Sequence, residues 1–289
     1  MSWKNEEPSR EEIDALIANE GLPENVRIDP DDGLPYCTLC GGLRAKVKWT
    51  QFHNKREPIV AWFKCKCMEE EEQRLREEDV RREKRLMIER MRLVGLQDAC
   101  LRNYRFENGQ CDTEEMRKAM IYAEEFKDEP GKYPKGVVFF GPVGTGKTFA
   151  AGCIANALLD REIPVLMTNF PKLLALSAED REVSWTEEIQ KMQNYSLVIL
   201  DDFGAERESE YALEKIFYVI DERCKSGKPF ILTTNLTSEE MKHAKDLKHQ
   251  RIYDRIREQC GFVVCNTKNY RDEEAKKTHS GLRELFAEA

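Results

Sequence analysis

Five short apolar runs recur through the second half of the chain, and segments with a helical pattern lie between them. Each run is apolar on both faces of the strand it would form, so each strand should be buried on both sides. Buried strands that alternate with helices are typical of a parallel sheet covered by helices. The sequence therefore predicts an α/β fold. The predicted strands are Val137–Phe140, Val165–Thr168, Leu197–Leu200, Phe230–Thr234 and Phe262–Cys265.

The start of the chain has a different pattern. Residues 1–30 are polar and acidic, and we expect one short helix from Glu11 to Glu20, ended by Gly21 and Pro23. Further on, the stretch Ala45–Phe52 alternates apolar with polar side chains, which indicates a strand. So short a region cannot easily build an adequate apolar core. We expect it to need a cross-link or a bound metal.

The segment from Met68 to about Val94 predicts a long helix of mixed charge. In four pairs, beginning with Glu70 and Arg74 and with Glu72 and Arg76, an acid stands four residues before a base, the order that stabilises a helix. A solvated helix is the simpler interpretation, and a coiled coil that binds a partner is the alternative. The predicted parts of the chain are an N-terminal region at 1–67, a charged linker helix at 68–94 and a main domain at 95–289.

The main domain carries a phosphate-binding loop. The loop matches the pattern G-x-x-x-x-G-K-[ST], follows the first predicted strand and precedes a predicted helix at Thr148–Leu159. Its glycines let backbone N–H groups surround phosphate oxygens, and the helix N-terminus adds positive potential. Lys147 can reach the outer phosphates of ATP, and Thr148 can bind Mg²⁺. The loop residues are Gly141, Pro142, Val143, Gly144, Thr145, Gly146, Lys147 and Thr148.

Two later strands end in polar side chains that suit the same nucleotide. The strand at Leu197–Leu200 ends in Asp201 and Asp202, and the strand at Phe230–Thr234 ends in Asn235. Ligands of parallel sheets bind at the carboxyl ends of the strands. We expect Asp201 to hold Mg²⁺, Asp202 to orient or deprotonate the attacking water, and Asn235 to hydrogen-bond the γ-phosphate. A surface acidic turn and an Asn that caps the next helix are the simpler alternatives.

A predicted helix near the C-terminus carries Arg251, Arg255 and Arg257. Arg251 and Arg255 share one helix face, because they stand four residues apart. Arginine stays charged and suits the charge that develops on a transferring phosphoryl group. Helical spacing alone permits either residue in that role, and a solvated face explains three arginines in isolation.

Four cysteines predict a structural zinc site in the N-terminal region. Cys37 and Cys40 form a C-x-x-C pair, Cys65 and Cys67 form a C-x-C pair, and 24 residues separate the pairs. Four thiolates complete a closed tetrahedral site, and Zn²⁺ would supply folding energy. Replacement of one cysteine by His53, or four free thiols, are the alternatives. The other cysteines are expected to be packed or surface thiols: Cys100, Cys111, Cys153, Cys224, Cys260 and Cys265.

The net charge of −8 does not indicate a nucleic-acid binder, so any DNA contact must rest on a local basic strip. Residues 242–277 offer one, with ten Lys or Arg against six Asp or Glu, and a pair of solvated helices explains them equally well. No run of 18 apolar residues occurs, and the first residues lack the pattern of a secretory signal. We therefore expect a cytoplasmic protein with no membrane partner and no disulfides.

The order of these motifs resembles the AAA+ ATPase core of the DnaC/DnaI-type replicative helicase loaders and their IstB-type relatives. The similarity covers roughly residues 93–275 and rests on GPVGTGKT, LVILDDFGAE, ILTTNL, RIYDRI and the later Tyr270-Arg271. Before the core, the segment from Gly95 to Phe106 resembles the family's segment that lies against the nucleotide base. The resemblance implies a P-loop NTPase core with ATP and Mg²⁺ as cofactors.

The resemblance also implies roles for single residues. Asp201 and Asp202 would form the Walker B pair, and Asn235 would be sensor 1. Arg251 would be the arginine finger that acts on ATP held by a neighbouring subunit, and Arg271 would be similar to sensor 2. Most AAA+ proteins have Glu where this chain has Asp202, as expected for this clade, and the shorter side chain reaches less far toward water.

A function and partners follow from the same resemblance. It implies an ATP-dependent loader that places a replicative DNA helicase on single-stranded DNA in replication initiation, with ATP hydrolysis driving release. The active form would be a homo-oligomer with ATP sites between subunits. A transposition helper ATPase of the IstB type, which generally looks shorter before the core, is one alternative. A zinc-bearing adaptor that binds ATP with little turnover is the alternative from another class.

Overall fold

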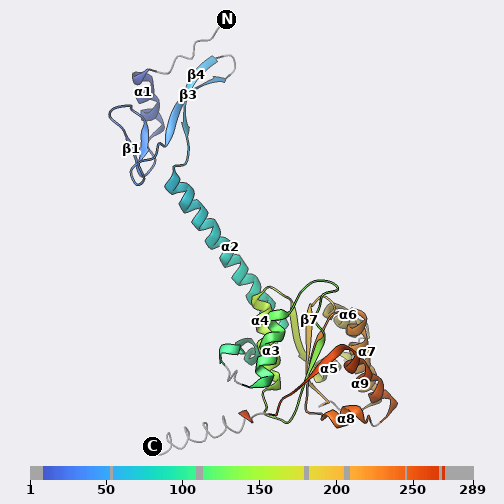
Figure 1. The fold of residues 1–289 in the computed structure, drawn as a ribbon. Helices are drawn as coiled ribbons and strands as arrows, with labels where there is room; N and C mark the ends of the chain where they lie inside the picture. Colours follow the sequence, from blue (N-terminus) through green and yellow to red (C-terminus); the bar gives the residue numbers. More distant parts are fainter. Residues whose placement is uncertain are drawn as a thin grey trace, which may run out of the picture. The chain divides into compact units, whose positions relative to one another are not determined.

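The computed structural model shows a chain of two compact units, residues 1–85 and 86–289 (Figure 1). Among the helices that it describes, none combines the length and the apolar character needed to cross a membrane. The described residues are 9–52, 55–108, 113–178, 182–204, 209–244, 246–266 and 269–270.

The N-terminal unit contains one helix and two antiparallel strand pairs. Helix α1 (Arg10–Glu20) precedes β1 (Val26–Ile28), which pairs with β2 (Pro35–Cys37), and β3 (Ala45–Phe52) pairs with β4 (Lys55–Trp62). The helix and the strand predicted from the sequence are both present. The apolar core is small. Among the described side chains, its cluster has three buried members, Ile17, Ala45 and Val60.

Helix α2 (Lys66–Gly95) is continuous over 30 residues, and the division between the two units falls within it. Most of its charged side chains are exposed and several form ion pairs along the helix, whereas Arg92 near its end is buried. Of the two pairs named above, Glu72–Arg76 is present at 2.7 Å, whereas Arg74 pairs with Glu71 at 2.6 Å in place of Glu70. Each solvated ion pair contributes little to the stability of the helix. An arginine can therefore pair with an acid three residues away as readily as with one four residues away.

The main unit is built on a five-stranded parallel sheet, which confirms the predicted fold class. The strands lie in the order β6-β7-β8-β5-β9, and every adjacent pair is parallel. The last strand begins two residues earlier than predicted, because Cys260 and Gly261 already pair with the first strand. The strands are β5 (Gly136–Phe140), β6 (Val165–Asn169), β7 (Leu197–Phe203), β8 (Phe230–Thr234) and β9 (Cys260–Val264).

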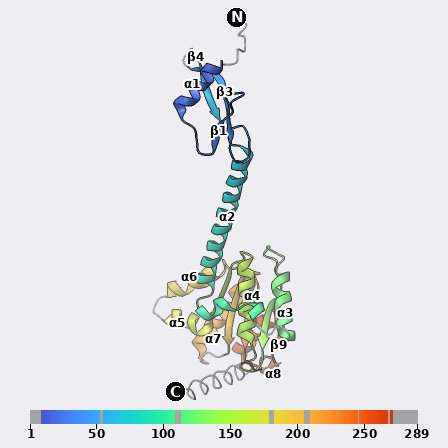
Figure 2. The same cartoon turned by 90° about the vertical axis from the view of Figure 1, so that its left-hand side faces the viewer.

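Helices cover both faces of this sheet. Helices α3 (Glu114–Glu125) and α4 (Lys147–Asp160) cover one face, with the 3₁₀ turns η1 (Ala99–Asn103) and η2 (Phe106–Asn108) beside them (Figure 2). Five helices contribute to the opposite layer (Figure 1). They are α5 (Phe170–Ala178), α6 (Glu182–Met192), α7 (Glu210–Lys225), α8 (Ser238–Lys242) and α9 (Leu247–Gln259).

Alternate residues of each strand enter the two apolar layers. In β7, Leu197 and Ile199 face the α3–α4 layer, whereas Val198 and Leu200 face the layer of α5 to α9. All four side chains are at most 1% exposed. The apolar runs of the sequence are therefore continuous because both faces are covered.

Candidate functional site

The strand order brings the predicted polar residues to one edge of the sheet. Strand β8 lies between β5, which leads into the phosphate loop, and β7, which ends in the two acids. Asn235 follows β8 and thus lies between the loop and Asp201. Motifs that are separated by up to about a hundred residues in the sequence are neighbours in the fold.

The phosphate loop turns directly from β5 into α4, and it needs glycine at its bends. Gly146 caps α4 with φ +86°, and Gly144 has φ +85°, a region that other residues rarely adopt. A Cβ atom on Gly141 would lie 2.0 Å from the carbonyl oxygen of Cys265. The Thr145 hydroxyl closes the loop by donating to the Pro142 carbonyl at 2.9 Å.

Lys147 begins α4 and points back over the loop. Its ammonium donates to the carbonyls of Gly141 and Pro142 at 2.8 and 2.7 Å and to Oδ1 of Asn235 at 2.8 Å. The lysine is 6% exposed, so its charge lies in a largely desolvated site. The structure therefore brings the loop lysine and the strand-end amide together.

Asp201 receives two hydroxyl groups on the same oxygen. Thr148, the last residue of the loop motif, donates to Oδ1 at 3.0 Å, and Thr233 of β8 also donates to Oδ1. Burial raises the pKa of Asp201, these two hydroxyls lower it, and the charge of Asp202 raises it, with a net increase. A cation at this carboxylate would offset both the desolvation and the repulsion between the acids.

A β-bulge sets the two acids in different orientations. Leu200 pairs with Leu232 and Phe203 pairs with Thr234, so Asp201 and Asp202 together oppose the single residue Thr233. Asp202 has φ +54° and is exposed, and its backbone N–H donates to the Thr233 hydroxyl at 2.9 Å. Thr233 thus contacts both acids. Sequence pattern alone assigns no role to Thr233, although the Thr-Thr-Asn end of the strand marks its position.

A C-terminal segment lies over the loop. The Tyr270 N–H donates to the Gly144 carbonyl at 2.9 Å, and its ring lies 3.4 Å from the position that a Cβ atom on Gly146 would take. A Cβ atom on Gly144 would meet the Asn269 side chain at 2.1 Å. The predicted site residue Arg271 lies outside the described residues, as do His53 and Cys111.

The segment that precedes the core packs against the helix that follows the loop. The Tyr104 ring lies 5.0 Å from the Phe149 ring, and a Cβ atom on Gly152 would lie 2.6 Å from Tyr104. Arg92 at the end of α2 donates to Asn156 of α4 at 3.0 Å. These contacts tie both segments to α4, whose N-terminus forms the phosphate loop.

The arginines of α9 have different surroundings. Arg251 lies over the ring of Phe217, with its Cζ atom 5.6 Å from the ring centre. Arg255 pairs with Asp221 at 3.2 Å and with Glu258 at 3.1 Å. Within the described part of the chain, no hydrogen bond or ion pair joins Arg251 to the phosphate loop.

The four predicted zinc ligands form one cluster in the N-terminal unit. The sulfurs of Cys37, Cys40, Cys65 and Cys67 all lie within 4.8 Å of one another. The Cys65–Cys67 and Cys37–Cys67 separations are 3.3 and 3.6 Å. A tetrahedral zinc site with Zn–S bonds of about 2.3 Å places its sulfurs roughly 3.8 Å apart. The donor set therefore fits Zn²⁺.

Backbone donors favour the thiolate at the start of this cluster. The N–H groups of Cys40 and Leu39 hydrogen-bond the Cys37 sulfur and lower the pKa of Cys37 to about 6. The side chain of Cys65, together with the other sulfurs, raises the pKa of Cys67 to about 12. A bound cation would favour four thiolates. A Cβ atom on Gly42 would lie 3.2 Å from Cys65, so a glycine lets the backbone approach the sulfurs.

The remaining described cysteines lie outside this cluster. Cys153, Cys260 and Cys265 are buried, Cys224 is half-buried and Cys100 is exposed. Burial raises the pKa of Cys265 to about 12. These thiols are therefore packing or surface groups, as the sequence predicts.

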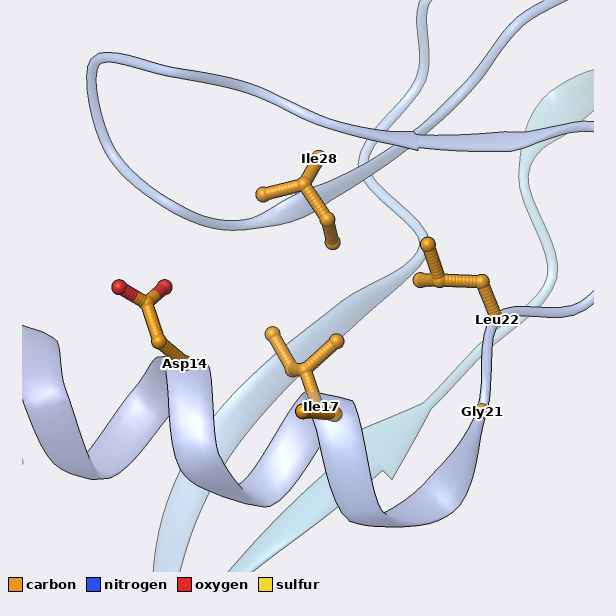
Figure 3. Close-up of a pocket in the computed structure, with 6 residues that line it drawn as sticks. Asp14, Ile17, Gly21, Leu22 and Ile28 are labelled. Atoms are coloured by element: carbon orange, nitrogen blue, oxygen red, sulfur yellow. The ribbon is translucent and has the colours of Figure 1, made fainter.

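An apolar hollow of about 390 Å³ also lies in the N-terminal unit (Figure 3). Ile17 of α1, Ile28 of β1 and Leu22 between them form its apolar walls. Asp14 is its one titratable lining residue among those described. With a single carboxyl group, the hollow carries no set of convergent catalytic side chains.

The parallel sheet, the glycine loop, the buried lysine and the acid pair define a P-loop ATP-binding protein of the AAA+ class. The chain belongs to the family of IstB-like ATP-binding proteins, whose family model matches residues 63–278. The replicative helicase loader DnaC of Escherichia coli K12 is 30% identical over 226 residues, which are 74% of this chain and 86% of DnaC.

Two further comparisons bear on the fold and the family. A crystal structure of DnaI has a TM-score of 0.52 at 24% identity, and the match covers 60% of this chain and 93% of the chain in that crystal structure. A putative ATP-binding protein in an insertion sequence of Mycobacterium tuberculosis is 30% identical over 102 residues, which are 35% of this chain and 41% of that protein. The first comparison supports the fold, and the second covers less than half of either protein.

Proposed function

We propose that the protein is an ATPase that loads a replicative DNA helicase onto single-stranded DNA, with ATP hydrolysis driving release. The observation that carries the proposal is the 30% identity to the helicase loader DnaC over 86% of that protein. The insertion-sequence relative matches over 41% of its length. The match extends over most of DnaC and over less than half of the insertion-sequence protein, which favours a helicase loader over a transposition helper.

Phosphate binding is assigned to the loop and Lys147. The carbonyl oxygens of Gly141 and Pro142 and the amide oxygen of Asn235 are neutral, so phosphate oxygens can take their place at the ammonium with a gain in charge attraction. Gly144 and Gly146 hold the backbone in the left-handed region, which suits N–H groups that point inward to an anion. Asn235 would hydrogen-bond the γ-phosphate from the adjacent strand.

Mg²⁺ would be held by Thr148 and Asp201, whose oxygen atoms are 3.0 Å apart. Hydroxyl and carboxylate oxygens are the ligands that this cation prefers, so the residues present fit it. When bound, it would supply positive charge to the phosphate oxygens. Asp202, on the exposed side of the bulge, would orient the attacking water and accept its proton.

The four cysteines would hold one Zn²⁺, which would supply folding energy to the N-terminal unit. We assign helicase contact to this unit, because loaders of the DnaI type resemble this arrangement of a zinc module before an ATPase. Single-stranded DNA contact is assigned to the basic strip at 242–277. Parts of that strip, at 245, 267–268 and 271–277, lie outside the described residues.

Oligomer formation is part of the proposal, because Arg251 would act on ATP held by a neighbouring copy. The guanidinium is exposed, and the described residues give it no contact with its own phosphate loop. An arginine that serves its own site would be expected near Lys147. ATP sites between subunits would make turnover depend on protein concentration.

A phosphate-release assay with and without single-stranded DNA tests the enzymatic part. We expect the rate of ATP hydrolysis per protein chain to rise with protein concentration and to change when single-stranded DNA is added. Turnover that responds to duplex DNA alone would favour the transposition helper. ATP binding without release of phosphate, at concentrations where oligomers form, would favour the adaptor and contradict the proposal.

A further inference from the structure

Helices α7 and α9 run in the same direction and contact each other at three matched positions. On each helix the three contacting residues are spaced by three and then by four positions, so they lie on one face of that helix. The outer two contacts are ion pairs at 3.5 and 3.2 Å, and the middle one is a cation over an aromatic ring at 5.6 Å. The contacts are Glu214–Lys248, Phe217–Arg251 and Asp221–Arg255.

Arg251, in the middle contact, has a different partner from Arg255, in the next contact along the helices. Arg255 faces two carboxylates, Asp221 and Glu258, which offset its charge, and Glu258 accepts a hydrogen bond from its guanidinium. Arg251 faces a ring, and within the described part of the chain no carboxylate lies within ion-pair distance of it. An aromatic face attracts a cation without forming the paired N–H···O bonds of a carboxylate. Arg251 therefore keeps its charge and its donors.

Phe217 is a fixed support rather than a mobile one. It is half-buried and packs against the apolar layer that contains its neighbours Ile216 and Ile220, both 0% exposed. A phenyl ring has only two side-chain torsions, whereas a free arginine side chain has more torsions and more rotamers to choose from. Contact with the ring limits the directions that the exposed guanidinium can take.

We propose that Phe217 is a positioning residue that holds Arg251, and not Arg255, ready for the nucleotide of a neighbouring copy of this chain. The inference rests on the proposed function, because it assumes that ATP is hydrolysed between subunits. A phosphate group that binds Arg255 must compete with two carboxylates. At Arg251 it competes with no carboxylate of the described residues, which makes Arg251 the better arginine finger. The inference also assigns a role to a side chain that touches no nucleotide.

Phe217→Leu tests the proposal, because leucine keeps an apolar side chain in the layer and lacks the aromatic face. An exposed contact of this kind contributes roughly 0.5–1 kcal/mol, so kcat should fall about 2- to 5-fold. The KM for ATP and the affinity for nucleotide should not change, because the phosphate loop is intact. Phe217→Tyr keeps the ring face and should retain kcat. Asp221→Asn removes the carboxylate of the neighbouring contact and should leave turnover unchanged.

Three outcomes would overturn the inference, and they separate it from the proposed function. If the wild type and Phe217→Leu have equal kcat while Arg251→Ala is inactive, Arg251 remains the arginine finger and Phe217 does not position it. Equal losses in Phe217→Leu and Phe217→Tyr, with lower thermal unfolding midpoints, would indicate a packing role. Full activity of Arg251→Ala would contradict the finger itself, and the inference would fail with it.

Discussion

The two units of the chain are stabilised by different means. The main unit buries both faces of a five-stranded sheet under two apolar layers, so its fold rests on burial of apolar surface. In the N-terminal unit, the described apolar cluster has three buried members, and four sulfurs converge in the same unit. We therefore expect the main unit to stay folded when it loses a functional side chain, and we expect the N-terminal unit to depend on its four cysteines.

Loss of a zinc ligand should have the largest effect, and it should be confined to the N-terminal unit. Structural zinc contributes about 10–16 kcal/mol in small zinc modules, which is more than so small a core can replace. Metal analysis should find one zinc per chain in the wild type and none in Cys37→Ser or Cys67→Ser. Cys100→Ser, which changes an exposed cysteine outside the cluster, is the matched control.

Both ligand variants should still bind ATP, because the phosphate loop belongs to the other unit. Limited proteolysis should cut the N-terminal unit first in these variants. Retention of zinc in both would contradict the four-cysteine site. Loss of ATP binding together with zinc would contradict the independence of the two units.

The next largest effect should come from Arg251 within the main unit. Arginine fingers contribute about 10³–10⁵ in rate in P-loop enzymes where they have been measured, so Arg251→Ala should bind ATP and almost cease to hydrolyse it. Lys147→Ala should not bind ATP productively, because Lys147 is the one cation of the loop. A mixture of the two variants should regain turnover at interfaces that pair an intact Arg251 with an intact loop.

Arg255→Ala is the matched control for that experiment and should hydrolyse ATP at a rate close to that of the wild type. Native mass spectrometry should verify that mixed oligomers form. If the mixture stays inactive although they form, Arg251 acts within its own chain or in assembly. Arg255 would then become the better candidate for the finger.

Asp202→Asn should slow hydrolysis by about 10²–10⁴, the range that general bases contribute, and leave ATP bound. Asp201→Asn should instead raise the Mg²⁺ concentration needed for half-maximal turnover, because it removes a charged ligand. Steady-state turnover at a series of Mg²⁺ concentrations distinguishes the two variants. Normal hydrolysis by both would show that these acids are not the Walker B pair.

Thr233→Val should have a smaller effect on the same site. Valine keeps the shape and removes the hydroxyl that contacts Oδ1 of Asp201 and the N–H of Asp202. Oδ1 of Asp201 would keep the Thr148 hydroxyl, so the change removes one of its two hydrogen bonds. Loss of a hydrogen bond to a charged group costs about 1.5–3 kcal/mol, which corresponds to a loss of roughly 10- to 150-fold in turnover if the acids move. Thr233→Ser restores the hydroxyl and should recover the rate. Equal rates in all three proteins would mean that the bulge holds the acids without this residue.

Much of the fold could be predicted from the sequence, because the relevant signals are local. Apolar runs located the five strands, and the glycine pattern located a turn whose backbone conformation other residue types rarely adopt. The proximity of Lys147, Asn235 and Asp201 followed from one rule, that parallel strands present their carboxyl ends at the same edge. Their catalytic roles remain predictions.

The features that could not be predicted depend on tertiary register. The bulge opposite Thr233 is a property of how β7 and β8 pair, and neither strand shows it alone. The difference between Arg251 and Arg255 arises on a different helix, at Phe217 and Asp221. Spacing along α9 makes the two arginines equivalent, and only the packed neighbour distinguishes them.

Capture of the replicative helicase of the same organism tests the central claim most directly. Purified helicase should be retained by the immobilised full-length protein with ATP present, and helicase should be transferred to single-stranded DNA circles as ATP is hydrolysed. Asp202→Asn should retain the helicase without releasing it, and Cys37→Ser should fail to retain it. No retention of the helicase by the wild-type protein, with or without ATP and with its zinc verified, would contradict the assignment as a helicase loader.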